Sequence, residues 1–281
     1  MTGRGEWVRV RRDRPCPVCE RSDWCLLARD GTAAICARIE SPKRAGAAGY
    51  LHKLTDNAAW PTSRTRSIPL SALPVRDFGT FRERCGAELT PDALARLADS
   101  LAVAVDALRR LGIGWSAEHR AFTLPMRGAR GEVCGVRLRL PNGRKLSVRG
   151  GREGLFIPSG LPADGRLFVC EGPTDTAALL TLGPAAIGRP SCAGGAKLVC
   201  DLARGRPVAI VADADSPGRR GAAALASTLA AHCKSVRVIT PPIGIKDARE
   251  WVRHGATAAD VLRAVDGADP ARLSVKATRR A

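Results

Sequence analysis

The sequence has few aromatic residues, few histidines and no long apolar run. Aromatic residues make up 4% of its 281 residues, with Tyr50 as the single tyrosine, and there are only 4 histidines. No segment approaches the roughly 18–20 apolar residues of a membrane span, and the basic N-terminus has no apolar stretch like that of a secretory signal. We therefore expect a cytoplasmic protein with no membrane partner, and nucleophilic catalysis by a Ser/His/Asp or Cys/His group is disfavoured.

Negative charge is also scarce. The chain has 45 Lys and Arg against 27 Asp and Glu, a net charge of +18, while 45% of its residues are hydrophobic. The hydrophobic content excludes a disordered basic tail. An excess of positive charge on a folded chain is typical of proteins that bind nucleic acid or nucleotides, although a general basic bias of the proteome is the alternative.

Cysteines cluster near the N-terminus. Cys16 and Cys19 stand in a Cys-Pro-Val-Cys motif, where two thiolates can grip one tetrahedral ion. The turn signal at 29–32, between short apolar stretches, predicts a hairpin that returns Cys36 to this motif. Because no secretory signal is found, we expect reduced thiols and a structural zinc site.

The fourth zinc ligand is open at this point. Cys25 is the favoured candidate and His52 is the alternative. The remaining cysteines stand singly among apolar neighbours and are interpreted as small core residues: Cys85, Cys134, Cys170, Cys192, Cys200 and Cys233. Residues 55–68 are polar and lack periodicity, which predicts a linker.

Helical spacing begins after the linker. Leu94, Leu97 and Leu101 recur on one helical face, and Thr90 before Pro91 is a helix start signal. The pattern predicts either one helix over 91–112 or two helices with a break near Val103.

From residue 121 onward the period falls to two, and Asn142-Gly143 is a hairpin turn, so we expect a small β-meander. Residues 137–152 contain six basic residues and no acidic one: Arg137, Arg139, Arg144, Lys145, Arg149 and Arg152. Arg137 and Arg139 share a strand face. We interpret this region as a phosphate-binding surface, with a solvated strand face as the alternative.

The rest of the chain alternates buried strands with helices. Strands are predicted over 167–170, 207–212 and 235–240, and helices over 174–182, 218–231, 246–254 and 257–265. This alternation predicts a compact, largely parallel α/β sheet covered on both faces.

Carboxylates follow the predicted strands directly. Glu171 follows the first strand, and Asp213 and Asp215 follow the second. Ligands of open α/β sheets bind beyond the carboxyl ends of the strands, and clustered carboxylates repel one another unless a cation lies among them. We therefore predict an Mg²⁺ or Mn²⁺ site. For Asp215 alone, helix capping is the alternative.

Other polar residues extend the same rim. Asp175 and Asp247 could join the acidic group, and Lys246 could neutralise phosphate charge. The glycine-rich segment 188–195 precedes a helix start at Ala196 and would let the backbone approach a ligand.

The ordered set of motifs resembles the primases of bacteria and phages. EGPTD at 171–175 and DADSPG at 213–218, each after a buried strand, resemble the TOPRIM fold. The segment 135–158 is similar to the basic β-subdomain of primase polymerase cores, and the cysteine motif to the zinc ribbon that precedes them. The resemblance implies α/β TOPRIM architecture with a zinc ribbon and a helical plus β-meander subdomain. The predicted parts are a zinc ribbon at 1–54, a linker at 55–68, a helical and basic β-subdomain at 69–160, a TOPRIM domain at 161–266 and a basic tail at 267–281.

The resemblance also implies an activity, the synthesis of short RNA primers from NTPs on single-stranded DNA. It implies catalytic metal ligation by Glu171, Asp213 and Asp215, and nucleotide or template contacts by Arg137, Arg139 and Lys145. No helicase domain is expected, so a separate helicase is the expected partner. The alternatives are a TOPRIM nuclease and a non-catalytic nucleic-acid-binding module. A topoisomerase is disfavoured because the single tyrosine lies beside the zinc ribbon.

Overall fold

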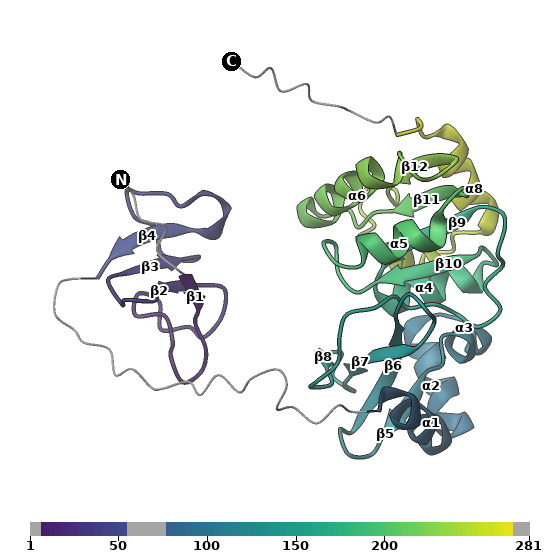
Figure 1. The fold of residues 1–281 in the computed structure, drawn as a ribbon, viewed down its shortest axis with the longest axis horizontal. Coiled ribbons are helices and arrows are strands. Elements are labelled where there is room, and N and C mark those ends of the chain that lie inside the picture. The colour runs from purple at the N-terminus through teal and green to yellow at the C-terminus, as the bar shows by residue number, and fades with distance from the viewer. Residues whose placement is uncertain (1–6, 55–76, 272–281) are drawn as a thin grey trace. The chain divides into compact units, whose positions relative to one another are not determined.

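The computed structural model describes residues 7–54 and 77–271, in two compact units (Figure 1). The units divide the chain into Met1–Ile68 and Pro69–Ala281, and each is described by itself. The predicted linker lies outside the described residues, as do residues 272–281 of the predicted basic tail. No described helix is long and apolar enough to cross a membrane.

The N-terminal unit is a four-stranded antiparallel sheet in the order β1-β2-β3-β4. Its elements are β1 (Trp7–Arg9), β2 (Leu26–Ala28), β3 (Ala33–Cys36), the 3₁₀ turn η1 (Gly46–Ala48) and β4 (Tyr50–Lys53). The predicted hairpin joins β2 to β3. Its turn is held by Asp30, whose Oδ1 accepts from the N–H of Thr32 at 3.1 Å, and Gly31 supplies a φ of 75°. The core is small and consists of Val10, Leu27, Ala34 and the cysteines.

Three short helices open the C-terminal unit: α1 (Phe78–Glu88), α2 (Pro91–Leu101) and α3 (Val105–Arg110). The two-helix alternative is therefore confirmed for residues 91–112. Thr90 caps α2 by accepting from the N–H of Ala93 at 3.2 Å, and α2 ends at Ala102 in the left-handed conformation. Helix α1, capped by Asp77, was not predicted.

The predicted meander is an antiparallel sheet in the order β5-β6-β7-β8. Its strands are β5 (Gly114–Ser116), β6 (Ala121–Arg127), β7 (Val133–Arg139) and β8 (Lys145–Ser147). Gly143, with a φ of 83°, forms the predicted turn between β7 and β8. Isolated bridges pair Leu155 with Arg127 of β6, and Phe156 with Gly188, so this segment ties the meander to the next sheet.

The second sheet of this unit has four parallel strands in the order β10-β9-β11-β12. Its elements are β9 (Leu167–Glu171), α4 (Gly172–Thr181), β10 (Ala186–Arg189), α5 (Ala196–Ala203), β11 (Pro207–Val211), α6 (Ser216–Leu229), β12 (Ser235–Ile239), α7 (Ala248–Arg253) and α8 (Ala258–Gly267). The predicted alternation of strands and helices is confirmed; β10 is the additional strand.

Alternating side chains of this sheet enter two cores. Phe168 and Cys170 of β9 join the core that includes α4, α7 and α8, whereas Leu167 and Val169 join the core that includes α5 and α6. The first core also takes in α2 and α3. Because helices cover both faces of the sheet, a ligand can reach it only at the ends of its strands.

Candidate functional site: a cysteine cluster and a charged cleft

The N-terminal unit brings four cysteines together: Cys16, Cys19, Cys25 and Cys36. Their sulfur atoms all lie within 4.8 Å of one another. The Sγ atoms of Cys19 and Cys25 are 3.7 Å apart, and those of Cys25 and Cys36 are 3.9 Å apart. Four thiol sulfurs at this spacing fit a closed, tetrahedral zinc site.

The backbone around the cluster favours thiolates. The N–H of Ala37 donates to Cys25 Sγ at 3.4 Å, and the N–H groups of Arg38 and Ile39 donate to Cys36 Sγ at 3.4 and 3.3 Å. Burial raises the pKa of the Cys25 thiol to about 12, and a cation bound to the sulfurs would remove that penalty. The cluster therefore suits a metal better than free thiols.

His52 lies outside this cluster. Its Nε2 lies 3.0 Å from the carbonyl oxygen of Ile39, and its backbone pairs with Ala34 across the sheet. The geometry thus favours Cys25 over His52 as the fourth ligand.

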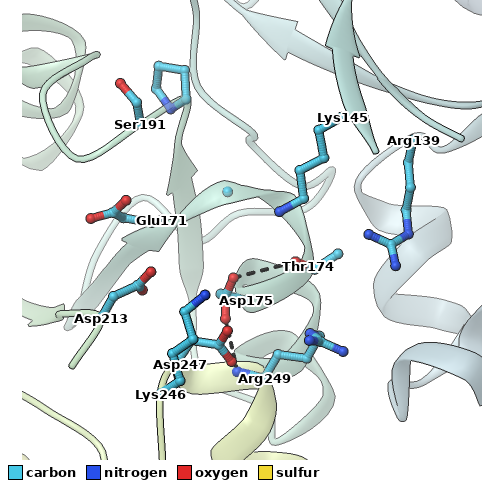
Figure 2. Close-up of a pocket in the computed structure, with 12 residues that line it drawn as sticks. Arg139, Lys145, Glu171, Thr174, Asp175, Ser191, Asp213, Lys246, Asp247 and Arg249 are labelled. Carbon is cyan, nitrogen blue, oxygen red and sulfur yellow. Dashed lines mark hydrogen bonds between the residues drawn. The ribbon is translucent and has the colours of Figure 1, made fainter. Parts of the chain in front are cut away.

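The C-terminal unit has a cleft of about 340 Å³ at the open edge of the parallel sheet (Figure 2). Glu171 is the last residue of β9, and Asp213 follows the neighbouring strand β11 by two positions. Both side chains therefore reach the same edge. The cleft is lined by Arg139, Lys145, Glu171, Gly172, Thr174, Asp175, Pro190, Ser191, Asp213, Lys246, Asp247 and Arg249.

The carboxylates of the cleft carry unfavourable negative charge. Burial, followed by repulsion from Glu171 and Asp247, raises the pKa of Asp213 to about 6. Burial, followed by repulsion from Asp247, raises the pKa of the almost completely buried Asp175 to about 7. Burial also raises the pKa of Glu171, opposed by Arg189, which pairs with it in register on β10. A cation among these groups would relieve the repulsion.

Two of the acidic residues near the cleft cap helices with their side chains, whereas Glu171 does not. Asp215 caps α6 by accepting from the N–H of Gly218 at 2.7 Å, and Asp247 caps α7 by accepting from the N–H of Glu250 at 2.7 Å. Glu171 stands at the N-cap position of α4 but makes no capping bond. Its carboxylate is therefore available for a ligand.

Asp215 does not line the cleft, yet its charge raises the pKa of both Glu171 and Asp213, so it lies near them. The alternative that Asp215 caps a helix is thus confirmed for its Oδ1 atom. No hydrogen bond from a described residue to its other carboxylate oxygen is found, so that oxygen could bind a cation.

The cleft fits a divalent cation that keeps water ligands. Among the described residues, only the cysteine cluster gathers three or more ligand atoms closely enough for a metal held by protein alone. Oxygen ligands spread over a wider cleft suit Mg²⁺, which completes its octahedral shell with water and substrate phosphates.

Basic side chains form the opposite wall. Arg139 of β7 pairs in register with Lys145 of β8, and both line the cleft. Lys246, in the loop before α7, lines the cleft from the acidic side, beside Asp247 (Figure 2). Arg137, on the same strand face as Arg139, donates to the carbonyl oxygen of Pro190 at 3.2 Å, next to the cleft residue Ser191.

Arg249 and Thr174 line the cleft without having been predicted, whereas Ser191 lies in the glycine-rich segment 188–195, which was expected to approach a ligand. Arg249 lies two positions after Asp247 in α7, and its N–H donates to Asp175 Oδ1 at 3.0 Å. Its spacing from Asp247 is no signal for the cleft, because residues two apart in a helix point to different sides.

No protein-family model matches the chain, and no curated protein matches it. Solved structures do. The zinc-binding and RNA polymerase domains of the Aquifex aeolicus primase align over 96% of this chain and 80% of theirs, with a TM-score of 0.55 and 14% identity.

Two further structures match about two thirds of the chain. The E. coli primase catalytic core covers 68% of this chain and 79% of its own, with a TM-score of 0.53 and 18% identity. A DnaG primase catalytic domain bound to single-stranded DNA covers 68% and 77%, with a TM-score of 0.54 and 19% identity. The predicted fold class is therefore confirmed: the chain has the fold of primase zinc-binding and catalytic domains.

Proposed function

We propose that the protein is a DNA primase, which synthesises short RNA primers from NTPs on a single-stranded DNA template. One observation carries the proposal. The carboxylates of Glu171 and Asp213 lie at the ends of adjacent parallel strands and form no hydrogen bond with another described residue. They face a cleft whose other wall is the basic strand pair β7–β8. The similarity of the fold to primase cores, one of them bound to single-stranded DNA, supports it.

In this proposal Glu171, Asp213 and Asp215 hold the catalytic cation, and Asp175 and Asp247 support the acidic rim. Mg²⁺ or Mn²⁺ held by these residues would activate the primer 3′-hydroxyl and would stabilise the leaving pyrophosphate. The half-buried position of Glu171 and Asp213 strengthens their attraction for a cation, because little water screens their charge.

Basic residues bind the nucleic acid and the nucleotide. Lys145 and Arg139 present positive charge beside the carboxylates, and Lys145 acts as a catalytic residue by neutralising charge on the reacting phosphates. Arg137 and Lys246 extend this surface toward the template. Phosphate contacts of this kind depend on salt concentration.

The cysteine cluster binds structural zinc and gives the small N-terminal unit its fold. In the proposed function this zinc ribbon helps to select the initiation site on the template. A separate replicative helicase is the expected partner, and the expected location is the cytoplasm, at the nucleoid.

A TOPRIM nuclease is the second candidate, because the same carboxylates could support strand cleavage. The basic meander beside the cleft favours the primase, since it offers a surface for nucleotide phosphates. A non-catalytic binding module is disfavoured because the acidic group is intact.

Incubation with single-stranded DNA, labelled NTPs and Mg²⁺ separates these functions. A primase gives short RNA products that disappear with Asp213→Asn. Degraded template without RNA would identify a nuclease, and salt-sensitive binding without either product would leave a binding module.

A further inference from the structure

Two arginines from different parts of the C-terminal unit meet at the cleft. Arg139 comes from β7 of the meander, and Arg249 comes from α7 beside the parallel sheet. Both are half-buried and both line the cleft. Figure 2 shows their side chains on the side of the cleft away from Glu171 and Asp213.

Neither guanidinium has an anionic partner within residues 7–54 and 77–271. No hydrogen bond or ion pair of either guanidinium is found there, although Arg249 is fixed through its backbone N–H to Asp175 Oδ1. Burial and, next, the charge of Arg249 lower the pKa of Arg139, so the two cations repel each other. Two unpaired guanidinium groups that are partly withdrawn from water favour an anion between them, because water solvates their charge only in part.

The chemistry of the cleft narrows the choice of anion. Its ligand must satisfy two guanidinium groups at one end and share a cation with carboxylates at the other. A single phosphodiester offers one charge, whereas a triphosphate tail offers several, along with oxygens that suit both the guanidinium fork and Mg²⁺.

We infer that Arg139 and Arg249 bind the β- and γ-phosphates of the incoming nucleoside triphosphate. The inference rests on the proposed primase function and adds Arg249 as a nucleotide-binding residue. Arg249 is the better residue to test, because the hydrogen bond from its backbone N–H to Asp175 places its guanidinium next to the acidic side of the cleft.

The test uses the full chain with Arg249→Gln, Arg249→Lys and, as a matched control, Arg253→Gln. Arg253 lies on the same helix but is exposed and does not line the cleft. Primer synthesis gives KM for NTP and kcat, inhibition by inorganic tripolyphosphate gives its Ki, and a separate titration gives the Kd for single-stranded DNA.

We expect Arg249→Gln to raise KM for NTP and Ki for tripolyphosphate by about tenfold to a hundredfold, since it removes charge-assisted hydrogen bonds. The Kd for DNA should stay as in the wild type, Arg249→Lys should recover part of the loss, and Arg253→Gln should behave as wild type. An unchanged KM for NTP, or a loss confined to DNA binding, would overturn the inference and leave the primase proposal standing.

If the wild type makes no RNA, the primase proposal fails. Calorimetric titration with tripolyphosphate then tests whether Arg139 and Arg249 form a phosphate-binding site. Binding of tripolyphosphate, without divalent cation, that weakens in Arg249→Gln but not in Arg253→Gln supports the site. Failure of the wild type to bind tripolyphosphate overturns it.

Discussion

The two units hold the residues that we propose as metal ligands in opposite ways. In the N-terminal unit, Cys16, Cys25 and Cys36 are completely buried and crowd around one point with little else in the core. In the C-terminal unit, Glu171 and Asp213 extend from a large core into an open cleft. We therefore expect the first arrangement to need a metal in order to fold, and the second to fold first and then offer ligands to a metal.

The difference follows from the donor atoms. Thiolates form a closed tetrahedral site that satisfies zinc completely, so such a site stabilises structure. Carboxylates shared with water leave coordination positions for a substrate, so such a site supports chemistry.

Removal of zinc is the largest expected effect and tests this comparison directly. Structural zinc contributes about 10–16 kcal/mol in small domains, more than the small core of the N-terminal unit can replace. A strong zinc chelator should make residues 7–54 protease-sensitive while residues 77–271 stay resistant. Protection of both units after confirmed loss of zinc would show that the cysteine cluster is not structural.

The ligand set gives the next largest effect. Cys25→Ser should abolish stable zinc binding, because it opens the fourth position of a buried tetrahedral site. His52→Ala should keep one zinc per chain, because His52 contacts the carbonyl of Ile39 instead. Zinc quantified after dialysis distinguishes the variants; zinc lost from His52→Ala and kept by Cys25→Ser would reverse the assignment.

Loss of one cleft carboxylate should affect activity and not folding. Asp213→Asn should reduce primer synthesis by about a thousandfold, because several kcal/mol of metal-derived stabilisation depend on the ligand charge. Thermal unfolding should stay the same or improve, since a half-buried charge is removed. Asp201→Asn, at an exposed ion pair with Lys197 on α5, is the matched control and should keep full activity. Equal activity in both variants would contradict the assignment.

The pH dependence of stability gives the smallest effect. Asp175 has its pKa raised from 3.8 to about 7 on folding. Between these values the folded protein keeps a proton that the unfolded chain has released, so the free energy of unfolding falls as pH rises. Urea unfolding without divalent cation should show this fall from pH 4 to 7, and Asp175→Asn should reduce it. If the free energy of unfolding instead rises over this range in the wild type but not in Asp175→Asn, the raised pKa of Asp175 is contradicted.

Local sequence signals predicted most of the fold. Thr90 and the Asn142-Gly143 turn act on the neighbouring backbone, so the sequence alone predicts them. The alternation of strands and helices follows from the pattern of apolar residues, which also needs no knowledge of tertiary contacts. The carboxyl ends of the strands then predicted that Glu171 and Asp213 would meet.

Features that depend on distant packing were missed. Strand β10 is not predicted by the sequence, and its last two residues fall in the predicted glycine-rich segment 188–195. Glycine is needed at position 188 because a Cβ there would clash with Thr176 Oγ1. Arg249 joins the cleft only because α7 packs against α4 and its N–H reaches Asp175. No local pattern carries such contacts.

Binding of Mn²⁺ to the zinc-loaded chain, followed by electron paramagnetic resonance, tests most directly whether the cleft is a metal site built on a preformed fold. We predict binding at pH 8 that weakens as pH falls through about 6, where protons compete for Asp213, and that is lost in Asp213→Asn but not in Asp201→Asn. Equal Mn²⁺ binding by the wild type and Asp213→Asn would contradict the account.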